Sequence, residues 1–307
     1  MTKKTLIKPE GVCALTGRTG RYVASHIIPK ALTNLSASGE MRLEVGMNLP
    51  VRKRYDSWYD ERLVIRNGED ILSEIDNEAI RSLRFHKLIW SGWKGKGLLD
   101  ESLEQVEGYG IRSLEISAPT LQLFFLSLLW RAAASSRAEF RDVRLSPDVL
   151  EDLRLRILMK QPGDLRDYPV QLVQLTTLGD LHNRTPLLEE CELPIEGWAG
   201  IKVPYVRFYF DGLVARVHLP SPRQLPEDYL KTCMGLGHDD QTLIVCIPYE
   251  DSRAFSNLKE SIQASSKPER PKLKVLALAA KHYANSYPNA GGASEIPVPK
   301  LQFYCTG

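Results

Sequence analysis

The stretch VPYVRFYFDGLVARVHL, residues 203–219, decides the fold class of this chain. Two alternating runs of β-branched and aromatic residues flank Asp211-Gly212, a pair that favours the type I′ turn of a β-hairpin. Both faces of residues 203–210 carry apolar or aromatic side chains, so this strand is expected to be central in a sheet or covered. The segment predicts an antiparallel hairpin within a larger sheet.

The rest of the second half predicts further strands and helices around this hairpin. Strands are expected at residues 168–177 and 241–247, and helices at residues 251–263 and 272–285. The final segment, residues 285–307, is rich in Pro, Gly and Ser and is expected to be extended or partly disordered.

Three helices are predicted in the first half. Residues 69–86 carry one apolar stripe at helical spacing, and residues 147–160 open with Ser146-Pro147, a helix-start signature. The most apolar stretch, LQLFFLSLLWRAAA at 121–134, predicts a buried helix over residues 119–135, because it is too short for a membrane span. The fold class is therefore α+β, and no membrane segment or secretory signal is expected.

Composition excludes several classes of protein. The 307 residues are 43% hydrophobic and 25% charged with a net charge of +2, which disfavours both a disordered chain and a uniformly basic coat protein. Five scattered cysteines include no C-x-x-C pair, so neither a disulfide framework nor a complete Cys₄ zinc site is expected. The simplest compartment for such a chain is the cytoplasm.

One constellation near the N-terminus carries possible chemistry. Cys13-Ala-Leu-Thr-Gly17 is followed, after a short spacer, by Ser25-His-Ile-Ile-Pro29. This pattern resembles HNH-endonuclease-like bacterial proteins, in which a zinc-knuckle C-x-x-C precedes a His-Ile-Ile-Pro turn. The resemblance covers residues 12–85 and implies a ββα-metal module. In that family the histidine is the general base that activates water, and a divalent cation such as Mg²⁺ or Mn²⁺ stabilises the charge on the scissile phosphate.

The zinc knuckle of that family is degenerate in this chain. Cys13 remains, whereas Thr16, Ile65 and Gly68 stand where the resemblance would place the other three cysteines. One thiolate cannot hold a structural zinc, which needs four ligands, so no structural zinc is expected. Burial of nearby aliphatic side chains would replace the metal.

The resemblance also supplies candidate site residues. His26 is the expected general base and Asp60 the carboxylate that orients it, while Glu69 and Asp76 are the expected metal ligands. Two plainer alternatives stay open: His26 is a hydrogen-bonded structural histidine, and Glu69 is favoured by the dipole at its helix N-terminus. For nucleic acid, expected to be DNA, the candidate contacts are basic residues in loops of the module: Arg21, Lys30, Arg52, Lys53 and Arg54. The alternative is a solvated basic loop.

Two functional hypotheses follow. The first is an HNH-like, metal-dependent nuclease, an effector of antiviral defence in conflicts between bacteria and phages. The second is a catalytically inactive HNH scaffold that binds nucleic acid or serves as an assembly subunit, with a protein partner or a second copy of the chain as its companion. Residues 1–95 would form the HNH-like module and residues 96–307 a larger α+β domain, with a sub-boundary near residues 161–168.

Overall fold

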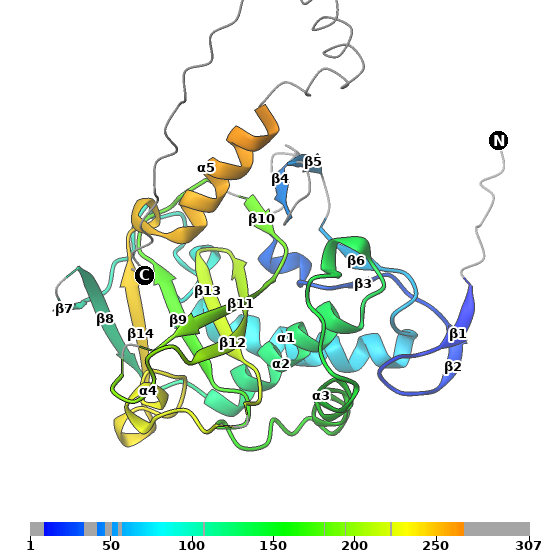
Figure 1. Ribbon diagram of the computed structural model, residues 1–307. Helices are drawn as coiled ribbons and strands as arrows, with labels where there is room; N and C mark the ends of the chain where they lie inside the picture. The colour runs from blue at the N-terminus through cyan, green and yellow to red at the C-terminus, as the bar shows by residue number, and fades with distance from the viewer. Residues whose placement is uncertain are drawn as a thin grey trace, which may run out of the picture.

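The computed structural model describes residues 9–33, 42–46, 51–54, 57–106, 108–180, 182–193, 195–221 and 223–266. Its centre is a mixed seven-stranded sheet with helices against one face (Figure 1). In spatial order the strands are β11 (Leu187–Glu192), β12 (Lys202–Phe210), β13 (Leu213–His218), β9 (Val170–Leu175), β14 (Thr242–Ile247), β8 (Tyr109–Leu114) and β7 (Glu104–Val106). The pairing is antiparallel throughout except between β14 and β9, which run parallel. The predicted α+β class is confirmed.

The hairpin predicted from Asp211-Gly212 is present as β12 and β13. Asp211 and Gly212 have φ angles of 49° and 78°, as a type I′ turn requires at both central positions. Gly212 is also needed for space, because an added β-carbon would lie 2.3 Å from the Trp90 ring. Strand β12 lies between β11 and β13 and is buried along most of its length, as predicted.

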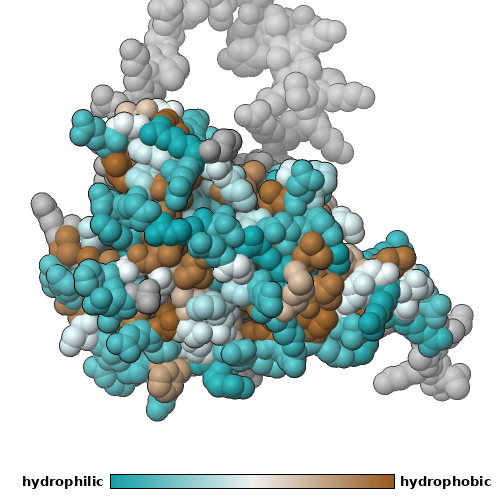
Figure 2. All heavy atoms as spheres, turned by 90° about the horizontal axis from the view of Figure 1, so that it is seen from below, coloured by the Kyte–Doolittle hydropathy of each residue, from teal (hydrophilic) through white to brown (hydrophobic). Residues whose placement is uncertain are grey.

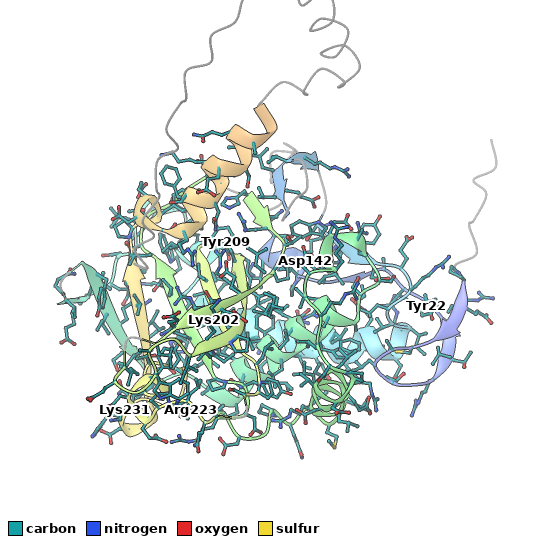
Figure 3. All side chains as sticks on the ribbon, viewed as in Figure 1. Tyr22, Asp142, Lys202, Tyr209, Arg223 and Lys231 are labelled. Atoms are coloured by element: carbon teal, nitrogen blue, oxygen red, sulfur yellow. The ribbon has the colours of Figure 1, made fainter. Side chains whose placement is uncertain are left out.

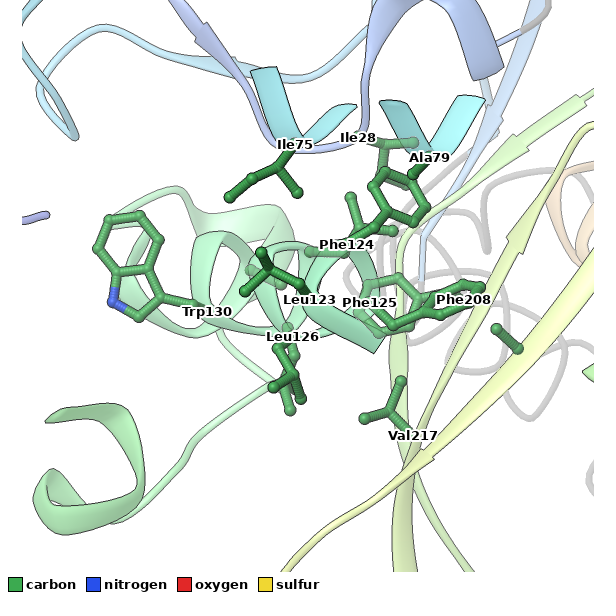
Figure 4. Close-up of a cluster of buried hydrophobic side chains, with 14 of the residues drawn as sticks. Ile28, Ile75, Ala79, Leu123, Phe124, Phe125, Leu126, Trp130, Phe208 and Val217 are labelled. Atoms are coloured by element: carbon green, nitrogen blue, oxygen red, sulfur yellow. The ribbon is translucent and has the colours of Figure 1, made fainter. Parts of the chain in front are cut away.

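Three helices form a layer on one side of the sheet: α2 (Ala118–Ala134) packs on β13, and α1 (Arg66–Phe85) and α3 (Pro147–Met159) pack on α2. All three were predicted, although α1 begins three residues earlier than the expected Glu69. The first turn of α3 is capped by the Ser146 hydroxyl, which accepts from the Val149 amide. Phe124 and Phe125 of α2 pack against the ring of Phe210 on β12, and Phe208 of the same strand lies beside Phe125 (Figure 4).

One large hydrophobic core lies between these helices and the sheet. It contains Cys13 and Leu15 near the N-terminus as well as Phe208 and Cys246 on the sheet, so it extends across the predicted boundary at residue 95. The division into 1–95 and 96–307 stays a prediction. A second cluster, on the other face of the sheet, consists mainly of Trp90, Trp93, Leu99, Val173, Leu175, Tyr209, Val214, Tyr249 and Ala254.

The N-terminal segment contains three small sheets. These join β1 (Glu10–Val12) with β2 (Thr19–Arg21), β3 (Ser25–His26) with β6 (Tyr59–Asp60), and β4 (Arg42–Val45) with both β5 (Arg52–Arg54) and β10 (His182–Arg184). Arg21 and the basic run 52–54 were expected in loops, and this is wrong for the backbone, because each is held in a strand by antiparallel pairing. The pairing of β4 with β10 is parallel.

The remaining elements are short, apart from one helix. They are α4 (Glu227–Leu230), α5 (Arg253–Ser266) and the 3₁₀ turns Lys30–Leu32, Trp90–Gly92, Ala138–Phe140, His238–Asp240 and Tyr249–Asp251. The predictions for residues 168–177, 241–247 and 251–263 match β9, β14 and α5. Those for the helix at 272–285 and the tail at 285–307 lie outside the described residues.

The surface seen from below is mostly hydrophilic, with hydrophobic groups in separate patches (Figure 2). Over the ranges that the structure describes, every helix is too short or too polar to cross a membrane.

Candidate functional site

His26 lies on the short strand β3. Strand β3 pairs with β6, with Ser25 opposite Asp60 and His26 opposite Tyr59. Paired residues share a face of a sheet and successive residues alternate. The register therefore places the Asp60 side chain on the face of Ser25 and the imidazole on the face of Tyr59, whose ring centroid lies 6.1 Å away.

The Asp60 carboxylate makes two hydrogen bonds away from the imidazole. Its Oδ1 accepts from the Arg62 amide at 2.8 Å, and its Oδ2 accepts from the Ser135 hydroxyl at 2.7 Å. The residue is buried, and the bond to Ser135 ties β6 to the segment that follows α2. These contacts stabilise the packing of β6 against the segment after α2, and the role of Asp60 in orienting His26 stays a prediction.

Asp76, the second predicted metal ligand, forms a buried ion pair. Arg131 of α2 donates from Nη1 to Oδ2 at 3.0 Å and from Nη2 to Oδ1 at 2.6 Å. The same guanidinium donates to the His26 carbonyl at 3.1 Å and to both oxygens of Ser127. Arg131 is only 1% exposed. The Arg131 guanidinium therefore joins α2 to both α1 and β3, and Asp76 supplies the negative charge that it needs.

Glu69 differs from the other two carboxylates. It lies in the first turn of α1, where the positive end of the helix dipole favours a negative charge. Its Oε2 atom is buried and accepts no hydrogen bond from the residues that the structure describes. Of the predicted site acids, Glu69 is thus the one that keeps an unpartnered oxygen.

The four positions of the degenerate knuckle meet where the turn between β1 and β2 rests on the start of α1. The Cys13 thiol accepts weakly from the Thr16 amide at 3.4 Å, and a β-carbon added to Gly68 would lie 2.8 Å from this sulfur. Ile65 forms an isolated bridge with Tyr22 and packs against Gly20. Buried side chains thus fill the space between the turn and the helix.

The basic candidates lie on the surface where they are described. Arg21, Lys30 and Arg52 are exposed, and the Arg21 Nε is 3.2 Å from Glu10 Oε1. The side chains of Lys53 and Arg54 lie outside the described part. Trp90 and Trp93, aromatic residues close to this region in sequence, are buried and donate to the carbonyls of Leu175 and Lys87, so they do not offer rings for base stacking.

The expected cation site does not form a ligand set in the described residues. No group of three or more His, Cys, Asp or Glu side chains is arranged there to hold a metal ion. Asp76 is neutralised by Arg131, and each oxygen of Asp60 already accepts one hydrogen bond. The predicted donors, as placed, do not fit an Mg²⁺ or Mn²⁺ ion, which prefers several oxygen ligands.

Sequence reasoning missed the partners that come from beyond residue 95. Arg131 and Ser135 bind the acids of the N-terminal segment, and Arg137 donates to the Tyr59 carbonyl at 2.7 Å. The sequence signal was Arg131 itself, because a charged residue within an otherwise apolar buried helix requires an acidic partner.

Comparisons with protein-family models, with curated proteins and with solved structures give no match to this chain.

Proposed function

We propose that this chain uses an HNH-like ββα scaffold to bind nucleic acid without hydrolysing it. The observation that carries the proposal is the bidentate Arg131–Asp76 ion pair, which occupies both oxygens of a predicted metal ligand. Breaking such a buried pair costs about 3–5 kcal/mol, so Asp76 is a poor ligand for an exchangeable cation. The engagement of Asp60 by Ser135 and Arg62 supports the same conclusion.

The proposed contact with nucleic acid rests on exposed cations of the same segment. Lys30 lies just after the Ser-His-Ile-Ile-Pro turn and Arg52 lies on β5, and both side chains are exposed. The chain as a whole is nearly neutral, so binding would depend on this local charge and would weaken with salt.

Binding is tested by fluorescence anisotropy of a labelled short duplex DNA with the full chain, over a series of salt concentrations. The double variant Lys30→Gln/Arg52→Gln is expected to weaken binding and to reduce the salt slope by about one for each phosphate that is no longer neutralised. The matched control is Arg141→Gln/Lys202→Gln, which removes two exposed cations elsewhere. Equal weakening in both double variants would contradict a localised interface.

The absence of hydrolysis is tested with plasmid DNA in the presence of Mg²⁺ or Mn²⁺. No cleavage above that of His26→Ala is expected. The nuclease is the second candidate, and the unpartnered Glu69 Oε2 is the observation that favours it. Cation-dependent cleavage that disappears in both His26→Ala and Glu69→Gln would overturn the proposal and establish the nuclease.

A further inference from the structure

The face of the large sheet opposite α1 and α2 carries an unusual concentration of arginines. Arg207 on β12 is directly opposite Arg216 on β13. Like charges in such cross-strand pairs repel each other, because their β-carbons lie close together on one face. Two adjacent guanidinium groups on a mostly buried face therefore require negative charge nearby.

Among the described residues, Arg207 has an acidic hydrogen-bond partner, whereas Arg216 has a neutral one. Arg207 donates from Nε and Nη2 to the two carboxylate oxygens of Glu189, at 2.9 Å each. Arg216 donates from Nη1 to the neutral amide oxygen of Gln171 at 3.1 Å and lies over the Tyr205 ring. The Arg216 Nε atom is buried and has no hydrogen-bond partner among the residues that the structure describes.

A third arginine approaches the same face from β10. His182 of β10 stacks on Tyr209 of β12, with ring centroids 4.7 Å apart, and Figure 3 shows Tyr209 in this region. Arg184 follows two residues later, so its side chain leaves β10 on the face of His182, toward the sheet. Arg207 acts on Arg184 electrostatically, which places the two guanidinium groups near each other.

Of the three arginines, Arg184 has the most buried donor atoms without a hydrogen-bond partner among the described residues. It is 9% exposed, and its Nε and Nη1 atoms are buried without a hydrogen-bond partner in the described part of the chain. Burial and then the charge of Arg207 lower its pKa to about 10, against the attraction of Glu189 and Glu260. A buried guanidinium with two unused donors is costly to maintain, and a bound anion would supply both the acceptors and the missing charge.

We infer that the arginine cluster, defined as Arg184, Arg207 and Arg216, binds a small oxyanion of the phosphate class. Arg184 and Arg216 each supply donors that have no partner among the described residues, while Glu189 holds Arg207, which is paired with Arg216 and interacts electrostatically with Arg184. The burial of Arg184 and Arg207 favours a compact ligand, such as inorganic phosphate or the terminal phosphate of a nucleotide. The backbone of a nucleic-acid strand would instead need exposed cations. Arg184 shares the three-stranded sheet β10–β4–β5 with Arg52, but the arginine cluster consists of other side chains, and the inference does not depend on the proposed function.

The test is calorimetric titration of the full chain with inorganic phosphate, with adenosine monophosphate and with a short DNA strand, at constant ionic strength maintained with chloride. Phosphate or the nucleotide is expected to bind the wild type and to raise its melting midpoint above that of the chloride control. Arg184→Gln is expected to weaken binding about tenfold or more. Arg216→Gln, which alters a half-buried residue, serves as a second variant if Arg184→Gln fails to fold. Arg141→Gln, an exposed arginine far from the cluster in sequence, is the matched control.

Undiminished binding in both cluster variants would overturn the inference, as would the absence of phosphate and nucleotide binding to the wild type. Binding of the DNA strand alone through Arg184 would overturn the small-ligand assignment. Because the DNA interface is tested with Lys30 and Arg52, failure of one proposal is distinguishable from failure of the other.

Discussion

The role of Asp76 can be decided by replacing it with asparagine. Asp76→Asn keeps the size of the side chain but removes the charge that faces Arg131, whose side chain is 2% exposed. Removal of one partner of a buried pair costs about 3–5 kcal/mol. We expect a value near the lower limit, about 3 kcal/mol, because Arg131 retains its bonds to the His26 carbonyl and to Ser127.

The measurement is urea denaturation of the full chain in the presence of EDTA, followed by circular dichroism. The matched control is Glu74→Gln on the same helix, since Glu74 is 68% exposed and pairs with Lys160 at the surface. An exposed pair of this kind contributes about 0.5 kcal/mol. In the double variant Asp76→Asn/Arg131→Met, the destabilisation is expected to be smaller than the sum of the two single effects, because the two residues interact directly.

A different result would refute the structural reading of Asp76. If Asp76 serves a cation, Asp76→Asn changes metal-free stability by no more than the Glu74→Gln control does, and its effect appears only when Mg²⁺ or Mn²⁺ is added. That outcome would return Asp76 to the ligand set predicted from the sequence.

Three further predictions concern packing, pH and metal content. Gly68→Ala is expected to destabilise the chain by about 1–3 kcal/mol in the same urea assay, because the new methyl group meets the Cys13 sulfur and Val64, whereas exposed Asn67→Ala is expected to be tolerated. Burial lowers the pKa of His182 and that of His218 to about 4, while both titrate near 6.5 when unfolded. Stability is therefore expected to fall as the pH drops from 6.5 toward 4, by up to about 1.4 kcal/mol per pH unit for each histidine. The slope should become shallower in His218→Gln and stay unchanged in His238→Gln, whose side chain is 92% exposed; equal slopes would contradict the assignment. Elemental analysis is expected to find less than one zinc per chain, and stoichiometric zinc would show that Cys13 still belongs to a metal site.

The elements that the sequence predicts well are those whose signals are local. Asp211-Gly212 between two alternating runs is sufficient for the hairpin, and Ser146-Pro147 is sufficient for the start of α3. Strand β10 was not predicted, because His182-Asn183-Arg184 has no strand-like pattern. Its extended state depends on pairing with β4, a segment from the other half of the chain.

The candidate site likewise depends on contacts between distant parts of the chain, which the sequence does not reveal. The sequence places Glu69 and Asp76 on one predicted helix, and the resemblance implies that both bind one metal ion. Tertiary packing decides what Asp76 meets, and the partner is Arg131 from a helix that sequence reasoning assigned to another domain. The arginine cluster was likewise invisible in the sequence, since cross-strand register and the packing of β10 bring its members together.

The parallel pairing of β4 with β10 has a consequence for the order in which the chain folds. Leu43 and His182 are partners although most of the N-terminal half of the chain separates them. Closing so long a loop carries a large entropic cost before the contact returns any energy, so this pairing is expected to form late. During synthesis, β4 cannot pair with β10 until residue 184 has left the ribosome. The N-terminal segment is thus made first, yet it is completed only after β8 and β9 of the large sheet have been synthesised.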